Sequence, residues 1–427
     1  MAAQNANGDD LPFELVEEII ENIRDDMASL RVSSRVSKAW RTASLRHLFS
    51  VADFSLEKDF TRWRDIGASM AHVPLYVQKV NFEPGGRFRE KRIQDLKAKY
   101  PGENNKTDIM LEFLWQEHEH QAPPPNVRLP LMPRATKFLW SNMMTDPIRW
   151  TSQTKRFLST FPAVTELEFQ GMFLSTVEAK QFLSMFKHIQ SFTTTSIDIE
   201  SVSANAGVFT GDMTDLRILS LQDCRMSADW LVDEVFEKSR PTRLQHISYE
   251  FDMPFSPKTF IRLLDMAADS LEDMSLQPPS PGHIGWTKLP PFKKRAFPSL
   301  RSLKFAVISL GASPQPLFQL TWCAAALQLF PAALGLTTLS IHVFADESRE
   351  LTDILKQSFP FKWNLFAEVV LRVYPNLKKF VIIISMQYNF GKKTMEKSEL
   401  SVKRVLKGLG ERVRIEWVDE GPKPQDP

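Results

Sequence analysis

Apolar residues in the N-terminal part of the chain recur at helical spacing, in three short stretches. The first stretch carries a broad apolar stripe made of Leu15, Val16, Ile19, Ile20 and Ile23. Acidic residues that face water in such a helix lie between them: Glu17, Glu18 and Glu21. Pro12 falls in the first turn, where its missing N–H costs nothing. The pattern predicts a helix that starts near Pro12 and has one apolar side.

Two shorter helices are predicted to follow. The pair Asp25–Asp26 can cap a second helix that carries Met27 and Leu30. The pair Ser33–Ser34 can supply the cap of a third helix. The apolar positions of this third helix are Val36, Ala39, Trp40 and Ala43. A segment this short cannot bury all of its apolar surface by itself. Part of that surface must therefore contact the rest of the chain or a partner.

Beyond these helices, the short pattern apolar-x-x-apolar-x-apolar returns along the chain. Its copies begin at Val77, Ala135, Val164, Ile189, Leu216, Leu244, Leu271, Leu300, Leu336 and Leu377, with a weak last copy at Val413 and Ile415. From Val164 to Leu300 successive copies are 25, 27, 28, 27 and 29 residues apart. Proline precedes many copies, and between them lie stretches with helical periodicity, at 177–186, 229–236, 259–268 and 366–373. This punctuation predicts alternating strands and helices.

The period resembles that of leucine-rich repeats, in which each unit of ~20–29 residues contains a strand and a helix. The stretch Leu216-x-x-Leu219-x-Leu221-x-x-Cys224 fits the repeat template to its last position, and the other copies are irregular. The resemblance implies a solenoid, and an ordinary α/β fold with the same alternation is the other interpretation. We therefore expect an α/β protein with a short N-terminal three-helix segment and an irregular leucine-rich-repeat-like solenoid.

Alternate residues of the predicted strands point away from the core. They are mostly small and polar, and the candidate partner-binding residues among them are Thr193, Ser220, Gln222, Ser248, Glu250, Ser275, Lys304 and Ser340. Small side chains let a partner approach the sheet closely, although Ser and Thr are also simply tolerated on an exposed strand. Early copies carry Glu166 and Glu168, whereas late copies carry Lys379, Arg412 and Arg414. Such a gradient would orient a charged partner.

The N-terminal stretch also carries a more specific pattern. It reads Leu11-Pro12-x-Glu14-Leu15, then Ile19-Ile20 and Leu30, then Val36-Ser37-x-x-Trp40, then Leu45 and Leu48-Phe49. In order and spacing this stretch resembles an F-box, and the resemblance covers about the first fifty residues. It departs at Ser37, where many members of the family have cysteine.

The resemblance implies a partner and a role. F-boxes bind the Skp adaptor, which links them to the cullin and RING subunits of an SCF-type ubiquitin ligase, while the remainder of the chain binds the protein substrate. Carried over residue by residue, the adaptor-binding surface is formed or supported by Leu11, Pro12, Leu15, Ile19, Leu30, Val36 and Trp40. Helices that dock apolar residues into a groove are a common mode of recognition, and Trp40 is the best candidate for a dominant contact. A role for Trp40 in the core of the helices is the alternative.

Two other functions fit the same residues. One is a scaffold outside the ligase that keeps the adaptor as a stabilising subunit. The other is a free-standing repeat protein whose N-terminal helices only cap the solenoid. A cap needs a polar outer face, and the apolar positions Leu11, Leu15 and Ile19 argue against it.

Composition narrows the classes further. Among the 427 residues, 43% are hydrophobic and 24% charged, as in an ordinary folded protein. The formal net charge of +2 argues against a dedicated nucleic-acid binder. Two cysteines, Cys224 and Cys323, exclude a disulfide scaffold and fit a reducing compartment, so we expect a cytoplasmic or nuclear protein. The polar start is no signal peptide, and no apolar run approaches the ~20 residues of a membrane span.

Catalytic motifs are lacking. The His cluster Glu117-His118-Glu119-His120 does not have the HExxH spacing that puts two metal ligands on one helical turn. No glycine-rich phosphate loop and no GxSxG nucleophile motif occurs. We expect a non-catalytic protein without cofactor or metal.

The predicted domains are an F-box at 9–50 and a repeat region at 51–418, followed by a disordered tail at 419–427. An insertion is expected at about 87–132. The basic cluster 293–295 is either a nuclear import signal or a solvated loop.

Overall fold

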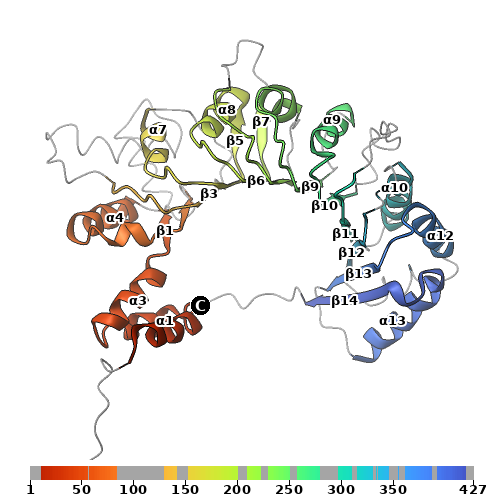
Figure 1. Cartoon of the computed structure of the whole chain (residues 1–427), viewed down its shortest axis with the longest axis horizontal. Helices are drawn as coiled ribbons and strands as arrows, with labels where there is room; N and C mark the ends of the chain where they lie inside the picture. Colours follow the sequence, from red (N-terminus) through yellow and green to blue (C-terminus); the bar gives the residue numbers. More distant parts are fainter. Residues whose placement is uncertain are drawn as a thin grey trace, which may run out of the picture. The chain divides into compact units, whose positions relative to one another are not determined.

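The chain is a mixed α/β protein with a large parallel sheet (Figure 1). The computed structural model describes residues 11–55, 57–83, 129–141, 152–200, 209–222, 229–250, 257–278, 297–309, 315–329, 333, 335–345, 354, 361–386 and 392–419. It contains two compact units. We call Met1–Ile189 with Ile197–Asp212 the N-terminal unit, and Gln190–Ser196 with Met213–Pro427 the C-terminal unit. Among the described helices, none has both the length and the apolar character needed to cross a membrane.

Three short helices open the N-terminal unit: α1 (Phe13–Asn22), α2 (Met27–Ser33) and α3 (Lys38–Leu48). Pro12 precedes the first helical residue and its carbonyl accepts the N–H groups of Leu15 and Val16. Asp26 caps α2 through its side chain. The predicted helices are therefore present.

The start predicted for the third helix is wrong. The N–H of Ser34 donates to the carbonyl of Leu30, which extends α2 through Ser33 and leaves Ser34 as its C-cap. Helix α3 begins only at Lys38, with Ser37 as N-cap. Val36 consequently lies in the turn between the two helices and is not part of the apolar side of α3.

The rest of the N-terminal unit alternates strands and helices. This unit contributes four strands to the large parallel sheet, which we call the main sheet. They are β1 (Val51–Phe54), β2 (Lys79–Phe82), β3 (Lys137–Ser141) and β4 (Glu166–Gln170). Its further helices are α4 (Glu57–Ser69), the 3-10 helix η2 (Val73–Tyr76), α7 (Ser152–Leu158) and α8 (Thr176–Ser184). A small second sheet pairs β5 (Phe173–Ser175) with β7 (Asp198–Glu200). Aromatic rings fill the core, with the Phe157 ring centroid 4.7 Å from that of Phe82.

Eight parallel strands follow one another in the C-terminal unit. They are β6 (Ser191–Thr195), β8 (Ile218–Gln222), β9 (His246–Glu250), β10 (Asp273–Gln277), β11 (Ser302–Ser309), β12 (Thr338–Ala345), β13 (Lys379–Met386) and β14 (Val413–Asp419). The described helical elements are the π-helix η4 (Leu231–Phe236), α9 (Pro257–Ala267), α10 (Gln315–Leu329), α12 (Trp363–Val373), α13 (Lys392–Val405) and the 3-10 helix η6 (Lys407–Arg412). With the four strands above, twelve described strands belong to the main sheet.

Helices of the C-terminal unit cover one face of its strands (Figure 1). Ring contacts join Tyr249 of β9 to Phe260 of α9 at 5.1 Å, and Phe366 of α12 to Phe380 of β13 at 6.0 Å. On β14, the indole N–H of Trp417 donates to Glu399 of α13 at 3.2 Å. These strand residues all point to the face of the sheet that the helices cover. Residues that alternate with them point to the opposite face of the sheet, away from the described helices.

The strands predicted from the repeated pattern are confirmed, and the apolar positions of each full copy are buried. The weak last copy corresponds to β14. The pattern does not predict β1, because its buried pair Ala52 and Phe54 forms too short an alternation to stand out. The helix predicted at 229–236 is present in part as the π-helix η4.

Several predicted features lie outside the described residues. They are most of the insertion (84–128), the cluster at 117–120, Cys224, the basic cluster at 293–295 and the tail after residue 419. The domain boundaries at 50 and 418 remain predictions.

Candidate functional sites

Helix α1 divides its apolar residues between a core and an exposed edge. Val16 and Ile20 have no exposed surface, and they pack with Leu30 and Ala43. By contrast, Leu11, Leu15 and Ile19 are 40%, 46% and 39% exposed. Residues four apart lie along one edge of a helix, so Leu15 and Ile19 are neighbours, and Leu11 lies before the helix, next to Pro12. We call these three residues the apolar helix edge.

The core beneath this edge is built from all three helices. Phe13, Ile23, Trp40 and Leu48 pack around its buried members. Because this core is complete without the apolar helix edge, the edge is not needed to hold the helices together. Its exposed apolar surface is available for burial against a partner, at about 25 cal/mol per Å² removed from water.

Helix α2 is held in place by its cap. Asp26 Oδ1 accepts the N–H groups of Ala28 at 3.0 Å and Ser29 at 3.1 Å, and Ser29 Oγ donates to Asp26 Oδ2 at 2.5 Å. Hydrogen bonds from the Ser29 hydroxyl and backbone N–H lower the pKa of the Asp26 carboxyl. The cap directs Leu30 into the core, while Met27 and Val32 stay exposed.

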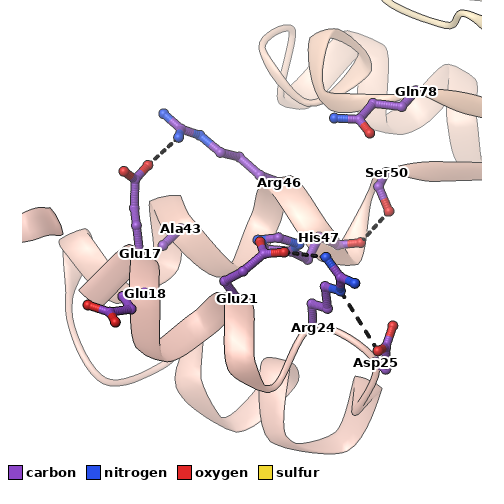
Figure 2. A pocket seen from close by; sticks show the side chains of 10 residues that line it. All are labelled: Glu17, Glu18, Glu21, Arg24, Asp25, Ala43, Arg46, His47, Ser50 and Gln78. Carbon is purple, nitrogen blue, oxygen red and sulfur yellow. Dashed lines mark hydrogen bonds and ion pairs between the residues drawn. The ribbon is translucent and has the colours of Figure 1, made fainter. Parts of the chain in front are cut away.

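Charged pairs fix α1 against α3. Figure 2 shows Glu17 of α1 and Arg46 of α3 reaching toward one another, and they form an ion pair. His47 Nε2 lies 3.6 Å from a carboxylate oxygen of Glu21, which also pairs with Arg24. These contacts line an open pocket of about 670 Å³. Four acids and two arginines line the pocket, and the Glu17–Arg46 ion pair joins α1 to α3.

The structure places the predicted adaptor-binding residues in two groups. Leu11, Pro12, Leu15, Ile19 and Val36 are exposed. Leu30 is fully buried, and Trp40 is half-buried against the core, so these two support the surface from beneath. The core interpretation of Trp40 therefore describes most of its contacts. Sequence reasoning named Met27 only as an apolar position of the second helix and did not name Val32, and both are exposed.

The predicted partner-binding residues of the strands come together as a row. Backbone pairing aligns, strand by strand, Thr193, Ser220, Ser248, Ser275, Lys304 and Ser340. We call these six residues the polar sheet row. Gln222 and Glu250 lie two residues further along β8 and β9. Ser220 and Ser340 are 9% and 7% exposed, because the flanking strands cover their short side chains.

The acids on this sheet face have polar partners, whereas its lysine has no ion pair among the described residues. Glu250 accepts a hydrogen bond from Gln277 at 2.6 Å, and Asp273 lies 2.9 Å from His246 Nδ1. Lys304 is half-buried and makes no ion pair with any described residue. The row therefore combines small hydroxyl side chains with one lysine that has no ion pair among the described residues.

Neither a metal site among the described residues nor a comparison with known families assigns a function to the chain. Within the described ranges, His, Cys, Asp and Glu form no group of three or more that could hold a metal ion. The buried Cys323 thiol has a pKa well above its usual range because burial disfavours the thiolate, so it is a poor nucleophile. No protein-family model and no curated protein matches the chain.

Proposed function

We propose that this protein is the substrate-recognition subunit of an SCF-type ubiquitin ligase. In this role the three N-terminal helices are an F-box that binds a Skp-type adaptor, which carries the cullin and RING subunits. The strand–helix units form an irregular leucine-rich-repeat-like solenoid that binds the protein substrate. The protein itself is non-catalytic and works in the cytoplasm or nucleus.

The apolar helix edge carries the proposal. A three-helix segment with a finished core still exposes Leu11, Leu15 and Ile19, each at 39% or more. Aliphatic side chains at helical spacing are the anchors of helix-in-groove recognition. On the other side of the same helix, Glu17 forms an ion pair with Arg46 of α3 (Figure 2). The sequence resemblance supplies the identity of the partner.

The solenoid part of the proposal rests on repetition. Each predicted copy forms a parallel strand in chain order, and the apolar positions of each full copy are buried. Described helices pack on one face of these strands in the C-terminal unit. This leaves the polar sheet row free for a substrate.

Co-purification tests adaptor binding. We would express the full chain with the Skp adaptor and compare it with Leu15→Asp and Ile19→Asp variants by size exclusion. Each carboxylate would have to be buried without a partner, so we expect each change to weaken the complex at least about tenfold. Leu400→Asp in α13 is the matched control, because Leu400 is 70% exposed and lies in the C-terminal unit. A complex that tolerates both edge variants would refute the proposal.

Reconstitution separates a ligase subunit from a scaffold. The adaptor complex would be mixed with cullin, RING subunit and ubiquitin-loaded conjugating enzyme. Ubiquitin transfer to the chain itself, lost in Leu15→Asp, is the result expected for a ligase subunit. A stable adaptor complex without any transfer would favour the scaffold.

A further inference from the structure

Three cations on the sheet face that points away from the described helices have no ion pair with any described residue. They are Lys304 of β11, Lys379 of β13 and Arg414 of β14. Lys379 and Arg414 are exposed, and Lys304 is half-buried. Within the described part of the chain, none of them forms an ion pair or a side-chain hydrogen bond. They represent positive charge that the fold leaves uncompensated.

Strand register places these cations around a patch of hydroxyls. Lys304 aligns with Ser340, then Val381, then Arg414. The Cα atoms of Lys304 and Arg414 are thus about 14 Å apart, at about 4.8 Å per strand. Lys379 aligns with Thr338 and Ser302, one side-chain step along the same face. Ser302, Thr338 and Ser340 lie on β11 and β12 beside these cations, and the buried Val381 separates Ser340 from Arg414. We call the three cations and these three hydroxyl residues the basic patch.

Acids on the neighbouring strands β9 and β10 have hydrogen-bond or ion-pair partners of their own. Asp273, which aligns with Ser302, is engaged by His246 at 2.9 Å, and Glu250 by Gln277 at 2.6 Å. Glu416, two residues beyond Arg414 on β14, is the nearest acid on the face without an ion pair among the described residues. On β11 to β14 three cations face this one acid, so this part of the sheet face is positive, while Asp273 and Glu250 carry negative charge on β10 and β9.

We propose that the basic patch binds an acidic segment of the partner protein. Carboxylates of an extended acidic segment would pair with Lys304, Lys379 and Arg414, and their remaining lone pairs would accept from the hydroxyls between them. The short hydroxyl side chains of the floor let the segment lie close to the sheet. The inference deepens the proposed function and rests on it for the meaning of the segment as a substrate feature.

Peptide binding to the full chain in complex with its adaptor tests the patch. The probes are fluorescent peptides of alternating Glu and Ser, of alternating Lys and Ser, and of Glu–Ser sequence with phosphoserine. We expect the Glu–Ser peptide to bind and the Lys–Ser peptide not to bind. Each of Lys304→Glu, Lys379→Glu and Arg414→Glu should weaken binding about fivefold, the size of an exposed ion pair that is lost.

Matched variants make the result specific. Lys397→Glu changes the same charge on an exposed position of α13, and it should leave binding unchanged. Glu416→Gln removes the one acid beside Arg414 and should tighten binding. Equal binding of the Glu–Ser and Lys–Ser peptides, or insensitivity to Lys304→Glu, would overturn the inference. Binding of the phosphoserine peptide alone would overturn it in favour of phosphate recognition.

The adaptor complex is measured in the same samples. If the adaptor complex forms but binds the Glu–Ser and Lys–Ser peptides equally, the basic patch is refuted and the proposed function stands. Failure of adaptor binding, with the preference for the Glu–Ser peptide intact, refutes the F-box and leaves the patch as a binding surface of a repeat protein.

Discussion

The two candidate surfaces expose opposite chemistry. The apolar helix edge of the N-terminal unit presents three aliphatic side chains on top of a complete core. The polar sheet row of the C-terminal unit presents hydroxyls and a lone lysine. Burial of aliphatic groups gains free energy in proportion to area and without strong directional demands. Burial of polar groups gains little net free energy, and a partner that leaves them without hydrogen bonds binds less tightly. The edge is thus suited to affinity for one constant partner, and the row to discrimination among partners.

The difference follows from how each element divides its residues. A helix edge lies beside the core, so a stripe broader than the core leaves aliphatic groups outside, as with Leu15 beside Val16. A strand alternates strictly, so Leu219 enters the core and Ser220 faces away. The helices can therefore carry spare apolar surface, whereas the strands direct their leucines and their small polar residues to opposite faces of the sheet.

The strongest test of this comparison replaces one leucine in the core and one on the edge. Leu30→Ala removes a fully buried side chain and should destabilise α1–α3 by about 2–5 kcal/mol. Leu15→Ala removes a side chain that is 46% exposed and should change the stability by less than about 0.5 kcal/mol. Hydrogen exchange at the backbone amides of α1–α3 measures both. Equal losses would mean that the edge belongs to the core, and the comparison would fail.

Sequence periodicity predicts most of this division, but not all of it. The strand pattern locates the buried positions and also the polar sheet row, because alternation in a strand leaves no choice of side. The helical stripe does not show where the core ends, since Leu15, Val16, Ile19 and Ile20 are all aliphatic. Only the packing of Leu30 and Ala43 selects Val16 and Ile20. The start of α3 and the partners of charged groups such as Glu250 depend on hydrogen bonds that periodicity does not encode.

A smaller effect is expected at Ser37, where the chain departs from the F-box pattern. Its Oγ is buried without a hydrogen-bond partner among the described residues. A buried hydroxyl without a partner is unfavourable, while a thiol of similar size tolerates an apolar site. Ser37→Cys should therefore stabilise α1–α3 by about 1 kcal/mol, again read from hydrogen exchange. Ser29→Cys is the contrasting variant, because the Ser29 hydroxyl bonds Asp26, and it should not stabilise. Loss of stability in Ser37→Cys would show that the Ser37 hydroxyl is satisfied in solution.

Placing a serine on the apolar helix edge and a leucine in the polar sheet row tests the comparison further. Both variants should change the stability still less. Leu15→Ser and Ser275→Leu each alter an accessible position, so each should change the free energy of unfolding by less than about 0.5 kcal/mol. Leu15→Ser should weaken the adaptor complex and spare binding of the Glu–Ser peptide. Ser275→Leu, beside Lys304 in the row, should do the reverse. If either variant weakened both complexes, the two surfaces would not act separately.

The weakest effect concerns the cap that holds α2 beneath the edge. Hydrogen bonds lower the pKa of Asp26 in the folded chain, so its carboxylate contributes stability above the unfolded Asp pKa of about 3.9. This contribution is lost as the pH falls through the lower folded value. Asn also caps helices but does not titrate, so any advantage of the native chain over Asp26→Asn at neutral pH should shrink as the pH falls from about 5 toward 2. Hydrogen exchange in α2, corrected for the pH dependence of intrinsic exchange, follows the difference. A difference that does not change over this range would mean that the carboxylate of Asp26 does not hold α2, and that the position of Leu30 beneath the edge is set by the core alone.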